Sequence, residues 1–334
     1  MSRDETPPGL TQATARKALG QHFLFDPDIL KRTALAAGPV EGRTVIEVGP
    51  GPGGLTRALL DQGAGKVIAV EADERFAEAL QSWPEAEAGR LHVILKDARK
   101  VRWEETLTEL GASMPAMIIA NLPYNVGTPL LVNWLKAGAW RGEMALMFQK
   151  EVAERVCAKP NTDHYGRLAV LTHAVADPHI AFTLPPGAFR PPPKVDSAVA
   201  VLHPLPAEKV FPHLDKLEEV SGAAFGQRRK TLRNNLKGRV SAEALEALGI
   251  DPTRRPQTLS IEEFVRIADH LALGPHPHAY RRIREVGGGE SVLKVKEFRA
   301  RFRVDGEQVR VLRLESGYPK KKRPAWHDAI LAIE

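Results

Sequence analysis

Cysteine is almost absent from this sequence. Cys157 is the only one among 334 residues, so an internal disulfide is impossible and zinc or iron–sulfur sites built from clustered cysteines are excluded. Long hydrophobic runs are missing too, since no stretch of about 18 apolar residues occurs, and this predicts that the chain does not span a membrane. The N-terminal segment lacks the apolar core of a secretory signal. We therefore expect a mature protein that begins near Met1 and works in the cytoplasm.

What the chain does contain is enough apolar material for a globular protein. Apolar residues make up 43% of it and charged residues 26%, which excludes disorder over most of the chain. The length predicts two to three domains, at roughly 100–200 residues for each.

The positive charge is unevenly distributed along the chain. The net charge of +6 belongs entirely to residues 276–334, which hold 14 Lys and Arg against 8 Asp and Glu. Within the neutral remainder, the tract 228–239 contains no acidic residue. Its basic residues include Arg228, Arg229, Lys230, Arg233 and Lys237. Such a patch attracts phosphate backbones, although a solvated helix face would have the same composition.

Short apolar runs alternate with helical periodicity from residue 44 onward. The pattern predicts strands at 44–48, 66–71, 91–95, 116–120 and 144–148, with helices between them. This alternation is typical of an α/β fold, in which helices cover both faces of a parallel sheet. Two more strands are expected at 179–184 and 197–202. The proline-rich segment 185–193 between them is expected to have no regular structure.

The pattern changes after residue 203. Helices are predicted at 214–225, 227–237, 241–247 and 260–272, and Ser260 with Glu263 forms a capping box at the start of the last one. Residues 274–277 are expected to form a linker. Beyond it, apolar stretches at 292–304 and 309–314 flank Asp305 and Gly306, which predicts a β-hairpin. We expect a catalytic domain at 1–203, a helical domain at 204–274 and an extension at 275–334.

A glycine-rich loop follows the first predicted strand. Its glycines match G-x-G-x-x-G at Gly49, Gly51 and Gly54, and Glu71 lies 20 residues past Gly51 at the end of the second strand. The spacing fits a dinucleotide site. It fits equally well an S-adenosylmethionine (SAM) site in a methyltransferase of similar architecture, where Glu71 would bind the ribose diol. A tight turn with no ligand is the plain alternative.

Two prolines in this loop favour SAM over a dinucleotide. A pyrophosphate needs several backbone N–H donors, and Pro50 and Pro52 remove two of them. SAM has no phosphate and carries a sulfonium cation, so it does not need these donors. Asp97, after the third strand, offers a carboxylate that could accept from the adenine amino group; otherwise it caps a helix.

The tract 121–125, Asn-Leu-Pro-Tyr-Asn, follows the fourth strand at the carboxyl edge where open α/β sheets bind ligands. The amino group of adenine is a poor nucleophile, because its lone pair is delocalised into the ring. Acceptance of both N–H bonds by the Asn121 side chain and the Leu122 carbonyl would favour a pyramidal nitrogen. Pro123 stiffens the turn and Tyr124 can stack on the base. An ordinary proline turn is the alternative, and the chemistry requires no metal.

The tract 189–197 is the third element. Its prolines would hold Phe189 rigidly as a second stacking surface for an extruded base. A stiff connection between strands would look the same.

Together these motifs closely resemble the ribosomal RNA adenine N6-dimethyltransferase family, and within it the small-subunit type. Further matching tracts lie at 16–24, 149–152, 165–168 and 225–234, so the resemblance covers roughly residues 10–274. It implies a Rossmann-like, SAM-dependent methyltransferase that dimethylates two adjacent adenines in a hairpin loop near the 3′ end of 16S rRNA. The implied partner is the small ribosomal subunit precursor, which would make the basic tract RNA-binding, and a monomer is the default.

The resemblance also assigns site residues. The cofactor contacts fall on His22, Leu24, Gly49, Gly51, Glu71, Asp97 and Asn121, and the base site on Asn121, Leu122, Pro123, Tyr124 and Phe189. Some relatives have Asn at position 22. Protonation of the histidine could make cofactor binding sensitive to pH, whereas a structural histidine is the plain alternative.

Residues 276–334 have no counterpart in this family. Their hairpin has a weak likeness to the last strands of RelE-like RNA-cleaving toxins, from which we assign no activity. Extra RNA contact and a merely solvated extension are both open. Three rival functions are weighed for the whole chain: an erythromycin-resistance type enzyme acting on 23S rRNA, a non-catalytic rRNA-binding assembly factor and, disfavoured by the two prolines, a dinucleotide oxidoreductase.

Overall fold

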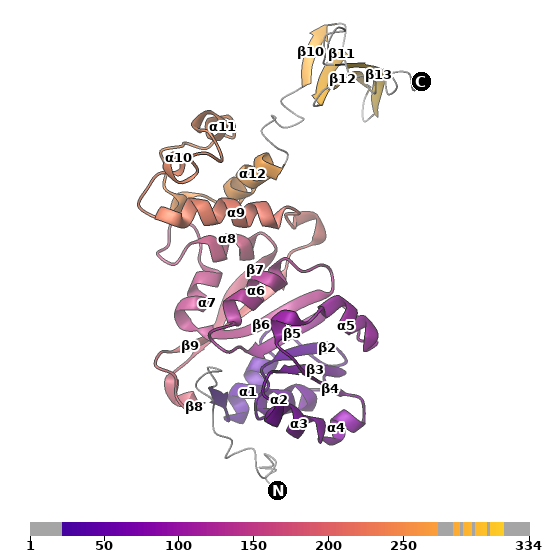
Figure 1. Ribbon diagram of the computed structural model, residues 1–334, viewed down its shortest axis with the longest axis vertical. Coiled ribbons are helices and arrows are strands. Elements are labelled where there is room, and N and C mark those ends of the chain that lie inside the picture. The colour runs from indigo at the N-terminus through magenta and orange to yellow at the C-terminus, as the bar shows by residue number, and fades with distance from the viewer. Residues whose placement is uncertain (1–21, 273–282, 288–289, 296–297, 306–307, 317–334) are drawn as a thin grey trace.

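A twisted seven-stranded sheet organises the protein (Figure 1). The computed structural model describes residues 22–272, 283–287, 290–295, 298–305 and 308–316. The sheet order is β4-β3-β2-β5-β6-β9-β7, in which the first five strands are parallel and β9 is antiparallel to both its neighbours. The strands are β2 (Thr44–Val48), β3 (Lys66–Glu71), β4 (Leu91–Leu95), β5 (Ala116–Asn121), β6 (Arg141–Gln149), β7 (Ala176–Leu184) and β9 (Ser197–Pro204).

These strands confirm the expected α/β fold. Three of them have the predicted bounds, and the other four extend beyond them by one to three residues at an end. The central strands are covered on both faces, so their sequences are mostly apolar; in β2 all five residues are buried, Thr44 and Glu47 included.

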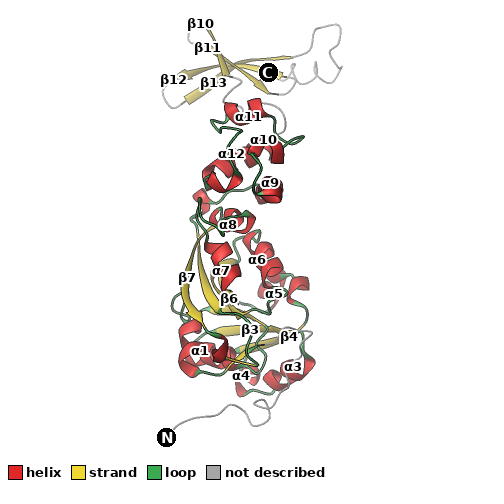
Figure 2. Cartoon of the chain, turned by 90° about the vertical axis from the view of Figure 1, so that its left-hand side faces the viewer, coloured by secondary structure: helices red, strands yellow, loops and turns green. Residues whose placement is uncertain are grey.

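Helices cover both faces of the sheet, as Figure 2 shows for α1 and α6. The helices up to residue 203 are α1 (Pro27–Ala34), α2 (Gly54–Asp61), α3 (Glu74–Gln81), α4 (Pro84–Glu87), α5 (Trp103–Glu109), α6 (Gly127–Leu135), α7 (Lys150–Cys157) and α8 (Arg167–His173). Alternate residues of each strand enter two different cores, because successive side chains point to opposite faces. Val45 packs with α1 and α2, and Ile46 packs with α5, α6 and α8.

The proline-rich segment does contain regular structure, so that expectation was wrong. A 3-10 turn at Pro186–Ala188 leads into β8 (Phe189–Arg190), which pairs antiparallel with β1 (Phe23–Leu24). Prolines at 191–193 lack N–H groups but leave positions 189 and 190 free to pair. Two-residue strands carry no periodicity, which is why the sequence did not indicate them.

The region after β9 is helical, as predicted. It contains α9 (Leu214–Ala224), α10 (Leu232–Asn235), α11 (Ala242–Ala247) and α12 (Ile261–Ala272). The expected continuous helix at 227–237 is wrong. The N–H groups of Leu232 and Arg233 donate to the carbonyls of Arg254 and Pro252, so a long-range loop replaces the start of that helix. The capping box is confirmed, since Ser260 and Glu263 each donate a backbone N–H to the other's side chain.

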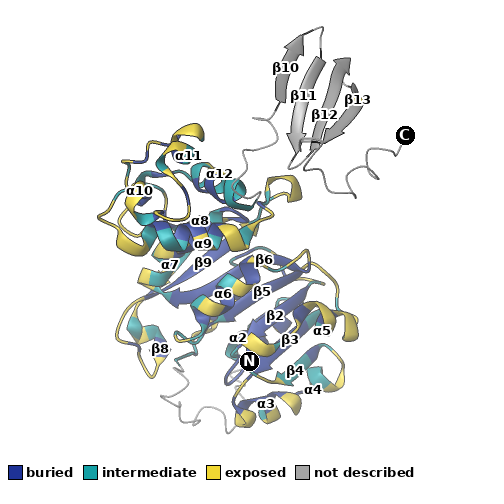
Figure 3. Ribbon diagram, turned by 45° about the horizontal axis from the view of Figure 1, so that its top comes forward, coloured by how far each residue is buried: buried dark blue, intermediate teal, exposed yellow. Residues whose placement is uncertain are grey.

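The helical region and the sheet share one hydrophobic core. Leu217 of α9 and Phe264 of α12 belong to the same buried cluster as Ile46 and Ile118 of the sheet. The Tyr165 hydroxyl, before α8, donates to the Leu259 carbonyl at 3.0 Å across the junction. Figure 3 shows the sheet as buried, while exposed residues gather around α10 and α11.

A separate four-stranded antiparallel sheet follows, in the order β10-β11-β12-β13. Its strands are β10 (Ile283–Gly287), β11 (Glu290–Val295), β12 (Phe298–Asp305) and β13 (Gln308–Ser316). The predicted hairpin of the last two strands is confirmed. The single apolar stretch at 292–304 is instead two strands, and β10 was not predicted. The expected linker at 274–277 and most of the tract 16–24 lie outside the described residues. Among the residues that the structure describes, no helix is long and apolar enough to cross a membrane.

Candidate active site

One cavity opens at the carboxyl ends of β2, β3, β4 and β5. Ten of the eleven cofactor and base residues expected from the sequence line it. They are His22, Leu24, Gly49, Gly51, Glu71, Asp97, Asn121, Leu122, Pro123 and Tyr124. The glycine loop therefore faces the Asn-Leu-Pro-Tyr corner across a single hollow. The two motifs lie close together, since a Cβ added to Gly49 would be 3.4 Å from Cδ of Pro123.

The backbone N–H groups of the glycine loop donate to acceptors within the protein. Between residues 49 and 53, the N–H of Gly49 donates to Val70, that of Gly51 to Glu71 and that of Gly53 to Pro50, at 2.9–3.0 Å. The two prolines in this stretch have none to give. Residues 49–53 thus offer no N–H donor to a pyrophosphate, and the chemistry of this loop disfavours a dinucleotide and suits SAM.

Gly51 also makes room for an aromatic side chain that the sequence did not point to. Its φ is +54°, and a Cβ there would lie 2.6 Å from Cε1 of Phe23. Phe23 lines the cavity and its ring meets Phe76 edge-on at 5.5 Å. A contact between residues so far apart in sequence leaves no local signal.

Glu71 is held in place by three backbone N–H groups. Oε2 accepts from Gly51 at 3.0 Å, and Oε1 accepts from Ala72 and Asp73 at 2.8 and 2.9 Å. Burial raises the pKa of this carboxyl, against the lowering effect of these bonds. A carboxylate has about four lone-pair sites, so one remains for a ribose hydroxyl.

A second carboxyl group, Glu47, lines the same cavity and was not singled out by the sequence. It is 1% exposed and accepts a hydrogen bond from Oγ1 of Thr56 at 2.6 Å. Burial raises its pKa to about 8, and the neighbouring Glu71 carboxylate acts in the same direction. Glu47 is therefore protonated at neutral pH.

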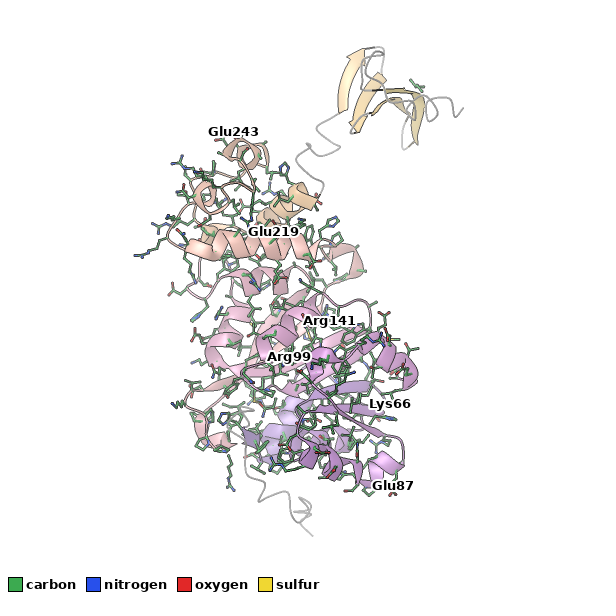
Figure 4. The ribbon with its side chains drawn as sticks, in the orientation of Figure 1. Lys66, Glu87, Arg99, Arg141, Glu219 and Glu243 are labelled. Atoms are coloured by element: carbon green, nitrogen blue, oxygen red, sulfur yellow. The ribbon has the colours of Figure 1, made fainter. Side chains whose placement is uncertain are left out.

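Asp97 shows the capping role that was the alternative for it. Oδ1 accepts the N–H of Arg99 at 3.0 Å at the start of a 3-10 turn, Ala98–Lys100. The Arg99 guanidinium, labelled in Figure 4, also grips both carboxylate oxygens, with Nη2 at 2.7 Å from Oδ2. This pairing lowers the pKa of Asp97. Asp97 lines the cavity nonetheless, and a part for it in binding adenine stays a prediction.

Asn121 ends β5 with its side-chain amide already engaged. Nδ2 donates to the His22 carbonyl at 3.0 Å. The amide nitrogen is thereby fixed on the protein, and the oxygen is the atom left to accept from a ligand. An adenine amine donates its N–H groups, so an oxygen that is left to accept is what its binding requires.

Tyr124 is fixed by a residue from the distant tract 189–197. Its hydroxyl lies 2.6 Å from Oγ of Ser197, a fully buried residue that begins β9. Its ring lies 5.4 Å from the His22 ring, and Nδ1 of His22 in turn donates to the Pro191 carbonyl at 2.8 Å. Burial raises the pKa of the Tyr124 phenol. The tract 189–197 thus supports the Asn-Leu-Pro-Tyr corner, which we call the base corner, at two points: Ser197 bonds to Tyr124, and Pro191 bonds to His22.

Phe189 is the one expected site residue that the cavity does not include. It is 2% exposed and pairs with Leu24 through β8 and β1, inside the core cluster around α1. Stacking of its ring on a base stays a prediction.

The five predicted RNA-binding residues are all exposed on the helical region. Arg228 differs from the others, because its Nη2 donates to the Asp163 carbonyl at 2.7 Å and so ties this region to the loop before α8. Among the described residues, no cluster of three or more His, Cys, Asp or Glu side chains could hold a metal ion.

Comparisons with known proteins identify the family of the chain. A family described as ribosomal RNA adenine dimethylase matches residues 12–273. A ribosomal RNA small subunit methyltransferase A from Agrobacterium fabrum is 53% identical over 261 residues, 77% of this chain and 93% of that protein. A protein of the same name from Gluconobacter oxydans is 52% identical over 256 residues, 76% of this chain and 82% of that protein.

Solved structures confirm the Rossmann-like fold. A dimethyladenosine transferase from Plasmodium falciparum superposes with a TM-score of 0.62 at 25% identity, over 74% of this chain and 96% of that one. The 23S rRNA methyltransferase ErmE gives 0.55 at 23% identity, over 75% and 99%, and this likeness shows the fold alone. Because the family match spans most of the chain and the relatives are identical at about half of the aligned residues, the chain belongs to the ribosomal RNA adenine dimethylase family.

Proposed function

We propose that this chain transfers methyl groups from SAM to N6 of two adjacent adenines in a hairpin loop near the 3′ end of 16S rRNA. The observation that carries the proposal is the single cavity in which the glycine loop meets the Asn121–Tyr124 corner. The small-subunit substrate follows from relatives above 50% identity that are named for that subunit. It displaces the erythromycin-resistance type, with which this chain shares only the fold.

The cavity offers SAM a matching set of groups. Glu71 retains an acceptor site for the ribose, Asp97 offers a carboxylate to the adenine once Arg99 releases it, and His22 lies on the same wall. SAM, when bound, supplies a methyl group on a sulfonium, which is electrophilic without a metal.

The base corner prepares the target nitrogen. Oδ1 of Asn121 and the Leu122 carbonyl accept the two N–H bonds of the adenine amine, which concentrates its lone pair on the side facing the methyl group. Tyr124, fixed by Ser197, stacks on the ring. Bound SAM would supply the methyl carbon to this nitrogen and keep the electron pair of its carbon–sulfur bond on sulfur, and the proton of the methylated amine would leave to water. Positioning and electrostatics supply the rate enhancement.

The remaining expectations belong to the same proposal. The basic tract 228–237 binds rRNA of the small-subunit precursor, and the chain acts as a monomer in the cytoplasm. A non-catalytic assembly factor would bind RNA without consuming SAM, and the intact Asn121 corner argues against it.

The test is to incubate the protein with methyl-labelled SAM and small or large subunits from cells that lack this modification. Label is expected in N6-dimethyladenine of the small-subunit rRNA, at two adjacent positions. Labelling of the large subunit instead, or tight RNA binding with no label, would contradict the proposal.

A further inference from the structure

The four-stranded sheet β10–β13 lies beyond the region that the family explains. The family match ends at residue 273, and the relatives cover only 76–77% of this chain. None of the residues that line the cavity described above belongs to this sheet. The sheet therefore calls for a separate functional explanation.

The register of the last two strands places basic residues opposite one another. Arg301 of β12 pairs with Arg313 of β13, and Arg303 pairs with Arg310. Cross-strand partners share one face of a sheet, and so do residues two apart along a strand. Arg299 therefore lies on the face that holds these four arginines.

The first two strands add to the same face. Lys294 of β11 is the partner of Arg299, and Arg284 of β10 pairs with Val292, which is itself the partner of Arg301. All seven basic residues of the four strands thus fall on one face, which we call the basic face. Three acidic residues share it, Glu290, Asp305 and Glu315.

The opposite face is mostly apolar by register. Phe298, Ala300, Phe302 and Val304 of β12 occupy it, together with their partners on β11 and β13, and it holds no Lys or Arg. A bulge between Arg301 and Phe302 keeps this separation, since it leaves Leu312 of β13 unpaired and 42% exposed. All seven basic residues lie on one face although they alternate with apolar residues in the sequence, and the opposite face also carries Glu285, Ser291 and Ser316.

The register of the basic face puts like charges at opposite positions. Arg301 faces Arg313, Arg303 faces Arg310, and Arg299 faces Lys294. Like charges directly opposite each other destabilise a pair of strands. Only two opposite-charge pairs offset these three, Arg299 with Glu315 and Arg303 with Glu290. An anion on this face would remove the repulsion.

We propose that the basic face binds the phosphate backbone of RNA, as a second contact surface of this chain besides the helical tract. Six of its seven basic residues are arginine, whose planar guanidinium binds a phosphate through two parallel hydrogen bonds. Along a strand these residues recur every ~7 Å, so they form a row of regularly spaced phosphate sites. Contacts of this kind do not depend on base sequence.

The experiment uses the full chain and a variant with Arg301→Gln and Arg313→Gln. Binding of labelled single-stranded oligouridylate and of unmodified 16S rRNA is measured over ~50–200 mM salt. The variant is expected to bind both more weakly. Its slope of log affinity against log salt is expected to fall by about 1.4, at ~0.7 for each phosphate that the protein no longer neutralises. Because the variant removes a like-charge pair, its thermal unfolding temperature should not drop.

The matched control carries Arg102→Gln and Lys209→Gln, two exposed residues far from the sheet in sequence, with the same loss of charge. Its salt slope should stay that of the parent. An equal fall in control and variant, or an unchanged slope in the variant, would overturn the proposal. So would a variant that keeps RNA binding but loses binding to vesicles of an anionic phospholipid. Asn121→Ala should keep the parent slope, which separates this proposal from the methyltransferase assignment.

Discussion

The cavity and the basic tract 228–237 are built in opposite ways. In the cavity, Glu71, Asn121 and Tyr124 are each held by hydrogen bonds to backbone or to buried side chains. On the tract, the five predicted RNA-binding residues are exposed, and Arg228 is the only one of them whose side chain hydrogen-bonds to another part of the described chain. Chemistry on one small group needs fixed positions, whereas attraction of a long polyanion needs charge at a surface. Substitutions in the cavity should therefore reduce the rate of methyl transfer, whereas substitutions in the tract should weaken RNA binding.

The largest effect is expected from Asn121→Ala. It removes the oxygen that accepts from the adenine amine, so kcat for methyl transfer should fall by about 10³, as when a preorganised polar group is lost from other active sites. Binding of rRNA should remain nearly unchanged, because the basic tract is intact. Single-turnover rates and RNA affinity are measured together, and the exposed Asn133→Ala in α6 serves as the control. Equal loss of transfer and of RNA binding would contradict the assigned role.

The sequence predicted this site well where the cause is local. Two of the three motif glycines, Gly49 and Gly51, have the positive φ of a tight turn, +70° and +54°, whereas the third, Gly54, begins α2 and the further positive φ, +87°, belongs to Gly53. Asn121 was placed at the cavity because it follows a buried strand. What was missed depends on residues far apart in the chain: Ser197 on Tyr124, and Phe23 on Gly51. Tertiary contacts of this kind leave no periodic trace.

The fold shows the same division. The buried parallel strands were predicted with bounds close to those observed, because burial on both faces makes their sequences mostly apolar. The helix expected at 227–237 was wrong, because the carbonyls of Pro252 and Arg254 take the N–H groups of Leu232 and Arg233. The predicted apolar stretch at 292–304 ran past the end of β11, so that two strands were taken for one. β10 was not predicted because few of its residues are apolar.

The next largest effect concerns the stability of the cavity. Glu47 keeps its proton in the folded chain up to about pH 8, whereas its ordinary pKa is 4.5. Between these values the unfolded chain releases a proton that the folded chain retains, so this group lowers the stability as pH rises. Glu47→Gln keeps an acceptor for Thr56 and cannot ionise. Relative to the parent it should gain on the order of 3 kcal/mol between pH 4.5 and pH 7.

Chemical denaturation of both proteins across that range measures the difference, in which all other titrating groups cancel. Glu85→Gln is a control of opposite sign, because hydrogen bonding from Arg57 lowers the pKa of Glu85. Removal of that carboxylate should lower stability relative to the parent as pH rises through the usual range of glutamate. Parallel pH profiles for the parent and Glu47→Gln would show that Glu47 is ionised inside the cavity.

A smaller effect is expected from substitutions in the exposed basic tract. Replacement of Arg228, Arg229 and Lys230 by Ala should weaken binding to rRNA and lower the salt slope by about 2, at ~0.7 for each phosphate neutralised. The rate of methyl transfer at saturating RNA should stay close to that of the parent, since the cavity is untouched. Salt titrations and single-turnover rates test both parts. An unchanged slope would identify the tract as a solvated surface.

The smallest effect sharpens the comparison within that tract. Arg228 both belongs to the basic surface and donates to the Asp163 carbonyl, so it combines charge with fixed geometry. Arg228→Ala should lower the free energy of unfolding by about 1 kcal/mol, less than a buried bond to a charged group because this one is exposed. Arg229→Ala removes the same charge without such a bond, and a change within about 0.5 kcal/mol is expected. Urea denaturation of the two variants decides it: equal losses would mean that the bond to Asp163 adds nothing, and that the tract is a charged surface throughout.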